Sequence, residues 1–197
     1  CPCRAEQDRV TRQRALSQWS ELPSALQTMT FETLALKPEL RDAMLTCRNY
    51  AKGDLSERWL VLSGPNGTGK THLAAAVLNW RNDHDEGGKR FGKWVNTPDL
   101  LADLRDGFRD DTAEQRYIRY RDVALLVLDD LGAENATAWA REQLFRLIEH
   151  RSVNLMETVI TTNLKPGAML PRLADRLLAV HTGLVKVIEV RGESWRS

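Results

Sequence analysis

The stretch GPNGTGKT occupies residues 64–71 and fits the pattern G-x-x-x-x-G-K-[ST] of a phosphate-binding loop, the P-loop. Its three glycines permit backbone conformations that a Cβ would bar, so the N–H groups of the loop can surround a phosphate. A helix that follows directly would present its positive N-terminal end to the same anion. Lys70 is placed to bind the β- and γ-phosphates, and the Thr71 hydroxyl to bind Mg²⁺. The stretch therefore predicts a site for ATP with Mg²⁺.

The sequence on either side favours a P-loop over a glycine-rich turn that matches by accident. An apolar run precedes the loop at residues 59–63, and an amphipathic helical pattern follows at residues 70–83. Strand, loop and helix in this order are the context that phosphate binding requires. We expect the nucleotide to contact the whole loop and the residue after it: Gly64, Pro65, Asn66, Gly67, Thr68, Gly69, Lys70, Thr71 and His72.

Further apolar runs alternate with helical stretches along the chain. The expected strands are residues 59–63, 91–96, 124–128, 158–162 and 185–190. The expected helices are residues 39–52, 70–83, 98–108, 112–121, 137–151 and 166–180. Pro38 is placed to open the first of these helices, and Thr97 to cap the third. This alternation predicts an α/β fold of three layers, a parallel β-sheet with helices on both faces.

Polar side chains follow two of the predicted strands. Asp129 and Asp130 end the apolar run ALLVLDD, and Asn163 ends the run VITTN. Strands of a parallel sheet bind ligands at their carboxyl ends, so Asp129 is placed to bind Mg²⁺ and Asp130 to orient or activate water. Asn163 could position that water at the γ-phosphate. The alternative is that solvated aspartates and a turn-forming asparagine end these strands.

Arginines are concentrated in two places. Arg105, Arg109, Arg116, Arg119 and Arg121 lie within one stretch of about twenty residues, which indicates either a solvated helical face or a surface for nucleic acid. Arg172, Arg176 and Arg196 lie near the end of the chain. Arginine can stabilise the charge of phosphoryl transfer, also from a neighbouring subunit, although most such arginines are ordinary surface residues.

The composition and the first residues argue against a membrane protein and a secreted protein. The formal net charge of +1 does not by itself indicate a nucleic-acid binder. No run approaches 18 apolar residues, so we expect a cytoplasmic protein without a membrane span. The start, CPCRAEQDRV, has no apolar region of the kind found in a secretory signal. Cys1 and Cys3 are either two free thiols or the tail of a truncated zinc ribbon. Cys47 lies in the expected helix at residues 39–52, and we expect it to be a packed residue.

The motifs GPNGTGKTHLAAAV, LLVLDDLGAE, VITTNL, RLADRL and GESWR occur in this order. Together they resemble the AAA+ ATPases of the DnaC/DnaI helicase loaders, and equally the IstB transposition helpers. The resemblance covers residues 25–197, which we expect to form the AAA+ domain, with residues 1–24 as an N-terminal lead-in. It implies a P-loop NTPase sheet of the ASCE type, with the acidic strand next to the P-loop strand.

The resemblance also implies roles for individual residues. Asp129 becomes the Walker B metal residue, Asp130 the catalytic acidic residue in place of the more usual glutamate, and Asn163 sensor 1. Arg176 is the candidate arginine finger, with Arg172 as the second candidate, and Arg196 matches sensor 2. The helical insert at residues 97–121 corresponds to the part that lines a channel for single-stranded DNA in such ATPases.

The resulting expectation is an ATPase that self-associates into a ring or helical oligomer, binds single-stranded DNA, and loads or remodels a replicative helicase. The alternative is an IstB-like helper that acts on DNA and a transposase. A small P-loop kinase would need a lid with convergent arginines, which the late arginines and the sensor-like asparagine do not favour. A nucleotide-binding switch without hydrolysis would need only the P-loop.

Overall fold

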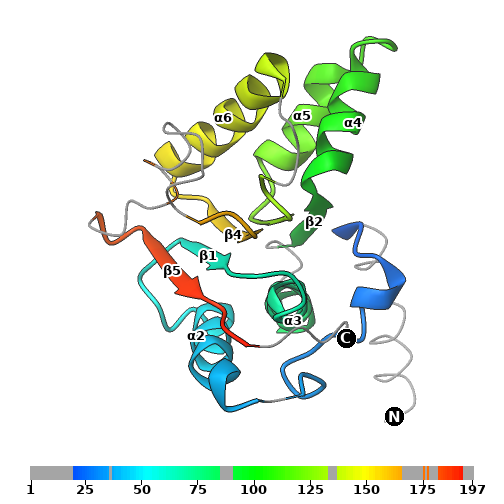
Figure 1. Cartoon of the computed structure of the whole chain (residues 1–197). Helices are drawn as coiled ribbons and strands as arrows, with labels where there is room; N and C mark the ends of the chain where they lie inside the picture. The colour runs from blue at the N-terminus through cyan, green and yellow to red at the C-terminus, as the bar shows by residue number, and fades with distance from the viewer. Residues whose placement is uncertain are drawn as a thin grey trace, which may run out of the picture.

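Five short strands form one parallel β-sheet (Figure 1). The structure is a computed structural model that describes residues 20–35, 37–84, 91–132, 137–165, 175, 177 and 182–192. The strands are β1 (Trp59–Ser63), β2 (Gly92–Asn96), β3 (Leu125–Asp129), β4 (Glu157–Thr162) and β5 (Val185–Glu189). Their order is β2-β3-β4-β1-β5, and every pair of neighbours is parallel. Their carboxyl ends therefore meet at one edge of the sheet, where ligands bind in such folds.

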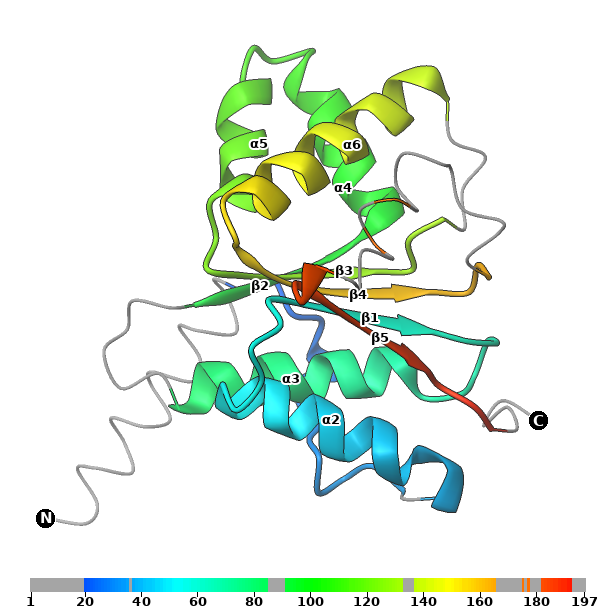
Figure 2. The ribbon, with the colours of Figure 1, turned by 90° about the vertical axis from the view of Figure 1, so that its left-hand side faces the viewer.

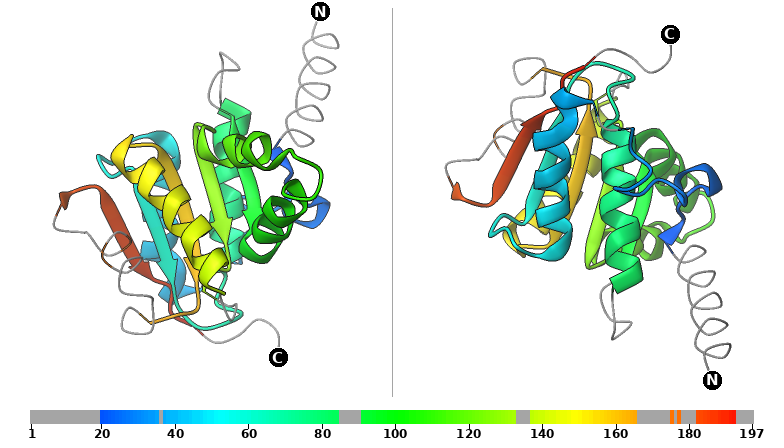
Figure 3. Two further views of the ribbon diagram at one scale, coloured as in Figure 1. Left: turned by 90° about the horizontal axis from the view of Figure 1, so that it is seen from above. Right: turned by 90° about the horizontal axis from the view of Figure 1, so that it is seen from below.

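Helices cover both faces of this sheet (Figures 2 and 3). One face carries α2 (Arg41–Lys52) and α3 (Lys70–His84), and the other carries α4 (Thr97–Gly107), α5 (Ala113–Arg121) and α6 (Ala138–Val153). Two short 3₁₀ turns, η1 (Ser24–Leu26) and η2 (Pro38–Leu40), precede α2. The predicted three-layer α/β fold is confirmed. Among the described residues, no helix is long and apolar enough to cross a membrane.

The core consists of two apolar clusters, one on each face of the sheet. The cluster beneath α2 and α3 includes Cys47, which is fully buried, as expected of a packed residue. It also takes in Leu22, Phe31 and Leu34 from the segment before α2. These apolar side chains fix the segment against the domain. The division of the chain at residue 25 stays a prediction.

The predicted elements agree with the observed ones to within two residues at most ends. The role expected for Thr97 was wrong, because Thr97 is the first residue of α4 and not its cap. Its hydroxyl donates a hydrogen bond to the carbonyl oxygen of Asp129 at 2.9 Å, which ties α4 to the end of β3. The expected helix at residues 166–180 lies outside the described residues, apart from Asp175 and Leu177, as do Cys1 and Cys3.

The position expected for the acidic strand was also wrong. β3 does not lie next to the P-loop strand β1, because β4 pairs in parallel with both and separates them. The side chains at the end of β4 therefore lie between the P-loop and the aspartates. Asp129 must reach Thr71 past β4, and the residues of β4 become part of the site.

Arg151, near the end of α6, is fully buried and holds several elements together. Its guanidinium donates to the carbonyl oxygens of Tyr120, Arg121, Val123 and Glu157 and to the Thr158 hydroxyl, at 2.6 to 3.1 Å. Burial lowers its pKa to about 10, which leaves the side chain charged at neutral pH. This one residue thus joins the end of α5, the start of β3 and the start of β4.

Candidate nucleotide site

The loop between β1 and α3 folds over the carboxyl end of β1. Gly67 and Gly69 have φ values of 77° and 96°, which L side chains rarely adopt. A Cβ at Gly64 would lie 2.2 Å from the carbonyl oxygen of Val190, so only glycine fits beside the chain that follows β5. Two of the predicted glycines are therefore needed for their backbone angles, and Gly64 is needed for close packing.

Lys70 begins α3, and its side chain folds back under the loop. Its ammonium donates hydrogen bonds to the carbonyl oxygens of Gly64 at 2.8 Å and Pro65 at 2.6 Å. Burial lowers the pKa of Lys70, while the carboxylates of Asp130 and Asp129 act in the opposite direction. A buried cation beside two carboxylates and a ring of loop amides is suited to hold a polyphosphate.

Asp129 and Thr71 come together from opposite sides of β4. The Thr71 hydroxyl donates to Asp129 Oδ1 at 3.2 Å, and the hydroxyl of Thr161 donates to the same oxygen at 2.6 Å. Burial raises the pKa of Asp129, and the hydrogen bonds from Thr161 and Thr71 counteract that rise. A carboxylate beside a hydroxyl is a donor set that suits Mg²⁺, which prefers oxygen ligands.

Asp130 has a φ of 58°, which is unusual for a residue other than glycine. Its backbone N–H donates to the Thr161 hydroxyl at 2.9 Å, and its Oδ1 accepts a hydrogen bond at 2.9 Å from the side-chain amide of Asn163. The structure therefore brings Asp130 and Asn163 into direct contact. The side-chain amide of the expected sensor, Asn163, thus donates to the carboxylate of the expected catalytic residue, Asp130.

These residues line one cavity of about 600 Å³. The P-loop and strand-end residues around it are Asn66, Gly67, Gly69, Lys70, Thr71, His72, Asn96, Asp129, Asp130, Thr161 and Asn163. Its other wall comes from the segment before α2: Leu26, Met29, Thr33, Leu34 and Ala35. Thr68 is buried and donates to the carbonyl oxygen of Pro65. The cavity is within the size range of small-molecule sites.

Sequence reasoning missed this second wall. The side-chain amide of Asn79 donates to the carbonyl oxygens of Leu26 at 2.9 Å and Met29 at 2.8 Å. His72 Nε2 lies 2.9 Å from the carbonyl oxygen of Thr30, so His72 contacts the segment before α2 directly. Because a carbonyl oxygen only accepts, Nε2 must carry a proton. The spaced apolar residues of an otherwise polar lead-in were the signal available in the sequence.

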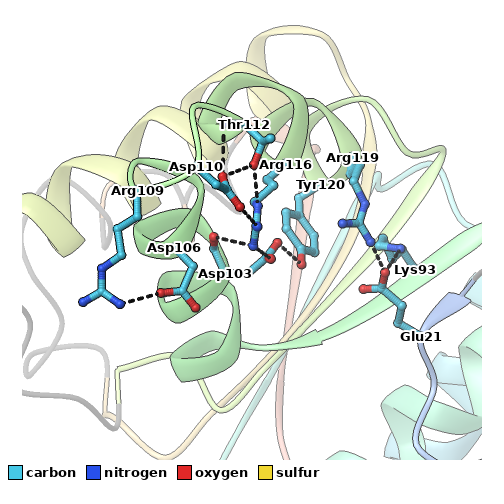
Figure 4. Close-up of polar contacts among 10 residues, drawn as sticks. All are labelled: Glu21, Lys93, Asp103, Asp106, Arg109, Asp110, Thr112, Arg116, Arg119 and Tyr120. Carbon is cyan, nitrogen blue, oxygen red and sulfur yellow. Dashed lines mark hydrogen bonds and ion pairs between the residues drawn. The ribbon is translucent and has the colours of Figure 1, made fainter.

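Four of the five arginines of the α4–α5 region contact carboxylates, and Figure 4 shows three of them, Arg109, Arg116 and Arg119. Arg116 pairs with Asp103 and Asp110, Arg119 with Glu21, Arg121 with Asp122, and Arg109 with Asp106. Residues 97–121 contain five arginines and six carboxylates. These ion pairs largely neutralise the arginines, which fits the solvated helical face better than the basic surface of the two alternatives. The three late arginines, Arg172, Arg176 and Arg196, lie outside the described residues.

Phe108, Trp139 and Arg105 form an aromatic group at the C-terminal end of α4. Phe108 is 62% exposed and meets the ring of Trp139 edge to face, with ring centroids 6.0 Å apart. The Arg105 guanidinium lies over the same indole, 5.2 Å from its centroid. An exposed ring beside an arginine is a combination that proteins use to stack unpaired bases. Phe108 and Arg105 come from residues 97–121, and Trp139 comes from α6.

Comparison with known proteins gives consistent matches. A family model described as IstB-like ATP binding protein matches residues 9–197. The replicative helicase loader DnaI of Bacillus subtilis is 26% identical over 86% of this chain and 55% of its own length. A protein of Mycobacterium tuberculosis, named as ATP-binding and in an insertion sequence, is 34% identical over 70% of this chain and 54% of its own.

Solved structures are similar to this chain in their fold. The crystal structure of the DnaC helicase loader superposes with a TM-score of 0.71 at 24% identity, covering 86% of this chain and all of that one. The chain spans about half the length of the two curated relatives above. The match therefore does not extend to the functions of the remaining parts of those proteins.

Proposed function

Because the chain belongs to the family of IstB-like ATP-binding proteins, we propose that it binds ATP with Mg²⁺ and hydrolyses it to drive a step on DNA. The contact that carries this proposal is the meeting of Thr71, Asp129, Asp130 and Asn163 in the cavity beside Lys70. A P-loop alone would support binding. A second carboxylate held by an amide supports hydrolysis in addition.

Each residue has a distinct task in the proposed reaction. Lys70 and the loop amides hold the β- and γ-phosphates, and Thr71 and Asp129 hold Mg²⁺, which neutralises charge on the phosphate oxygens. Asp130 accepts a proton from the attacking water, and Asn163 holds the Asp130 carboxylate and the water in line with the γ-phosphate. The apolar wall at Leu26, Met29 and Leu34 offers a surface for the adenine base.

Replacing Asp130 tests hydrolysis separately from binding. Asp130→Asn keeps the side-chain shape and an oxygen that can accept from Asn163, but it cannot take up a proton. We expect kcat to fall by about 100-fold or more, while ATP affinity changes by less than about threefold. Steady-state phosphate release and fluorescent-nucleotide binding measure the two quantities.

Asp111→Asn is the matched control for this experiment. Asp111 is also an aspartate at positive φ, 60°, and is exposed outside the cavity. Its replacement should leave both quantities unchanged. Hydrolysis by Asp130→Asn at the rate of the unaltered protein would argue that Asp130 has only a structural role. An unaltered chain that binds ATP without hydrolysing it would argue for a nucleotide-binding switch.

The proposed partner is a replicative helicase, loaded or remodelled on single-stranded DNA. The match to a helicase loader over 86% of the chain supports this choice. The alternative partner is a transposase, supported by the higher identity, 34%, to a protein of an insertion sequence. Loading of a hexameric helicase onto a single-stranded circle, assayed beside stimulation of a transposase, separates the two proposals.

Self-association into a ring or helical oligomer belongs to the same proposal. In that arrangement Arg176, or Arg172, would reach the ATP of a neighbouring subunit, and Arg196 would contact the nucleotide of its own. These roles rest on the motif resemblance, since all three residues lie outside the described part of the chain.

Single-stranded DNA is proposed to contact the aromatic group at Phe108. Phe108→Ala should weaken binding of a fluorescent oligonucleotide by about tenfold, because stacking contributes roughly 1–3 kcal/mol for each base. ATP hydrolysis without DNA should not change. Leu45→Ala removes another exposed apolar side chain, 45% exposed, from the opposite layer and is the control. Equal DNA affinity for the two variants would place the DNA contact elsewhere.

A further inference from the structure

Thr161 joins the two aspartates of the proposed site. It lies on β4, between the P-loop strand and the acidic strand, and its side chain is 2% exposed. Its hydroxyl donates to Asp129 Oδ1 at 2.6 Å and accepts from the backbone N–H of Asp130 at 2.9 Å. Its own carbonyl oxygen accepts from the N–H of Leu131 at 2.9 Å. Three consecutive residues are thus held by one threonine.

Both uses of this hydroxyl bear on the chemistry of the site. The bond to Asp129 fixes the rotation of a carboxylate that also contacts Thr71, 3.2 Å away. The bond to the Asp130 N–H holds the backbone at a φ of 58°, an angle that non-glycine residues adopt at some cost. Valine has nearly the same shape but can neither donate nor accept, so it would remove both bonds at once.

We propose that Thr161 is a positioning residue for ATP hydrolysis: it aims the Asp129 carboxylate at the Mg²⁺ position and sets the turn that presents Asp130 to water. This inference rests on the proposed function, since it assigns Asp129 to the metal. Groups that orient metal ligands in this way affect metal affinity or activity by about 10- to 100-fold. The competing account is that Thr161 merely satisfies buried polar groups.

Thr158 provides a matched control on the same strand. It is 1% exposed, and its hydroxyl also donates once and accepts once, to the carbonyl oxygen of Met156 and from Arg151 Nε. It lies at the opposite end of β4 from the site. Thr158→Val therefore removes an equivalent pair of buried hydrogen bonds without touching either aspartate.

The experiment compares Thr161→Val, Thr161→Ser and Thr158→Val in the whole chain. The readouts are the Mg²⁺ concentration for half-maximal hydrolysis, kcat, ATP affinity in EDTA, and urea unfolding. Thr161→Val should raise the Mg²⁺ requirement and lower kcat by about tenfold each. ATP affinity in EDTA should stay unchanged, because Lys70 and the loop amides do not depend on this hydroxyl. Thr161→Ser should recover both values to within about twofold.

Three results would overturn the inference. The first is a Thr161→Val protein whose Mg²⁺ requirement equals that of Thr158→Val. The second is a serine variant as impaired as the valine variant. The third applies if Thr161→Val does not fold. Thr161→Cys then replaces it, because a thiol is only a weak donor and acceptor. Equal Mg²⁺ requirements for the cysteine and serine variants would overturn the inference. An unaltered chain that hydrolyses no ATP would instead overturn the proposed function, and this inference with it.

Discussion

Lys70→Ala is expected to lower ATP hydrolysis by at least about 100-fold and to weaken ATP binding strongly, because it removes the cation under the phosphate loop. The Lys70 ammonium lies 2.8 and 2.6 Å from the carbonyl oxygens of Gly64 and Pro65. Lys70→Arg should fail almost as completely, because a planar guanidinium does not fit where a compact ammonium is held. Phosphate release and nucleotide titration measure both variants.

This loss should occur in a folded protein. Burial lowers the pKa of Lys70, which means that the folded state disfavours the charged form of this side chain. Removing it should therefore leave the melting temperature unchanged or slightly raised. Lys52→Ala, at the exposed end of α2, is the control and should behave as the unaltered chain does. A Lys70→Ala protein that hydrolyses ATP within about twofold of the unaltered rate would contradict this assignment.

Arg151→Met should cause a large loss of stability, because Arg151 is fully buried and donates five hydrogen bonds. The substitution keeps an unbranched chain but leaves four carbonyl oxygens and the Thr158 hydroxyl without their donor. Each buried group left unpaired costs about 1–3 kcal/mol, and the contributions are not additive. We expect the free energy of unfolding to fall by about 4 kcal/mol, a large part of the stability of an ordinary domain.

Equilibrium unfolding in urea, followed by tryptophan fluorescence, measures this difference. Arg146→Met is the matched control, because Arg146 lies on the same helix but is exposed and contacts only Gln143 and the Tyr117 ring among the described contacts. Its replacement should cost less than about 1 kcal/mol. Equal losses for the two variants would show that the buried network around Arg151 is not a main source of stability.

The sequence predicted the fold class and the positions of the elements, and it singled out the residues that line the cavity at the carboxyl edge of the sheet. The P-loop and the strand-end residues Asp129, Asp130 and Asn163 were predicted because local spacing and apolar runs decide them. The resemblance wrongly implied that the acidic strand β3 lies next to β1. β4 separates the two, and such a strand order depends on pairing between distant segments. Thr161 was not predicted for the same reason, because the hydrogen-bond partners of its hydroxyl come from the end of β3.

Side-chain partners were the least predictable part. Arg151 looked like one more arginine on an amphipathic helix, and only the fold shows that three chain segments converge on it. The arginines at residues 97–121 suggested a basic surface as one alternative. The carboxylates interleaved with them in the sequence already indicated that ion pairs could neutralise it. The wall at Leu26, Met29 and Leu34 depends on how an irregular segment folds back, which periodicity does not reveal.

The central claim is that the chain binds a triphosphate between the P-loop and the aspartates. Titration calorimetry of the chain with ATP in the presence of Mg²⁺ tests it most directly. We predict saturable binding of about one ATP per chain, weaker in EDTA and strongly reduced in Lys70→Ala. A chain that is folded by circular dichroism and shows no saturable heat with ATP, with or without Mg²⁺, would contradict the account.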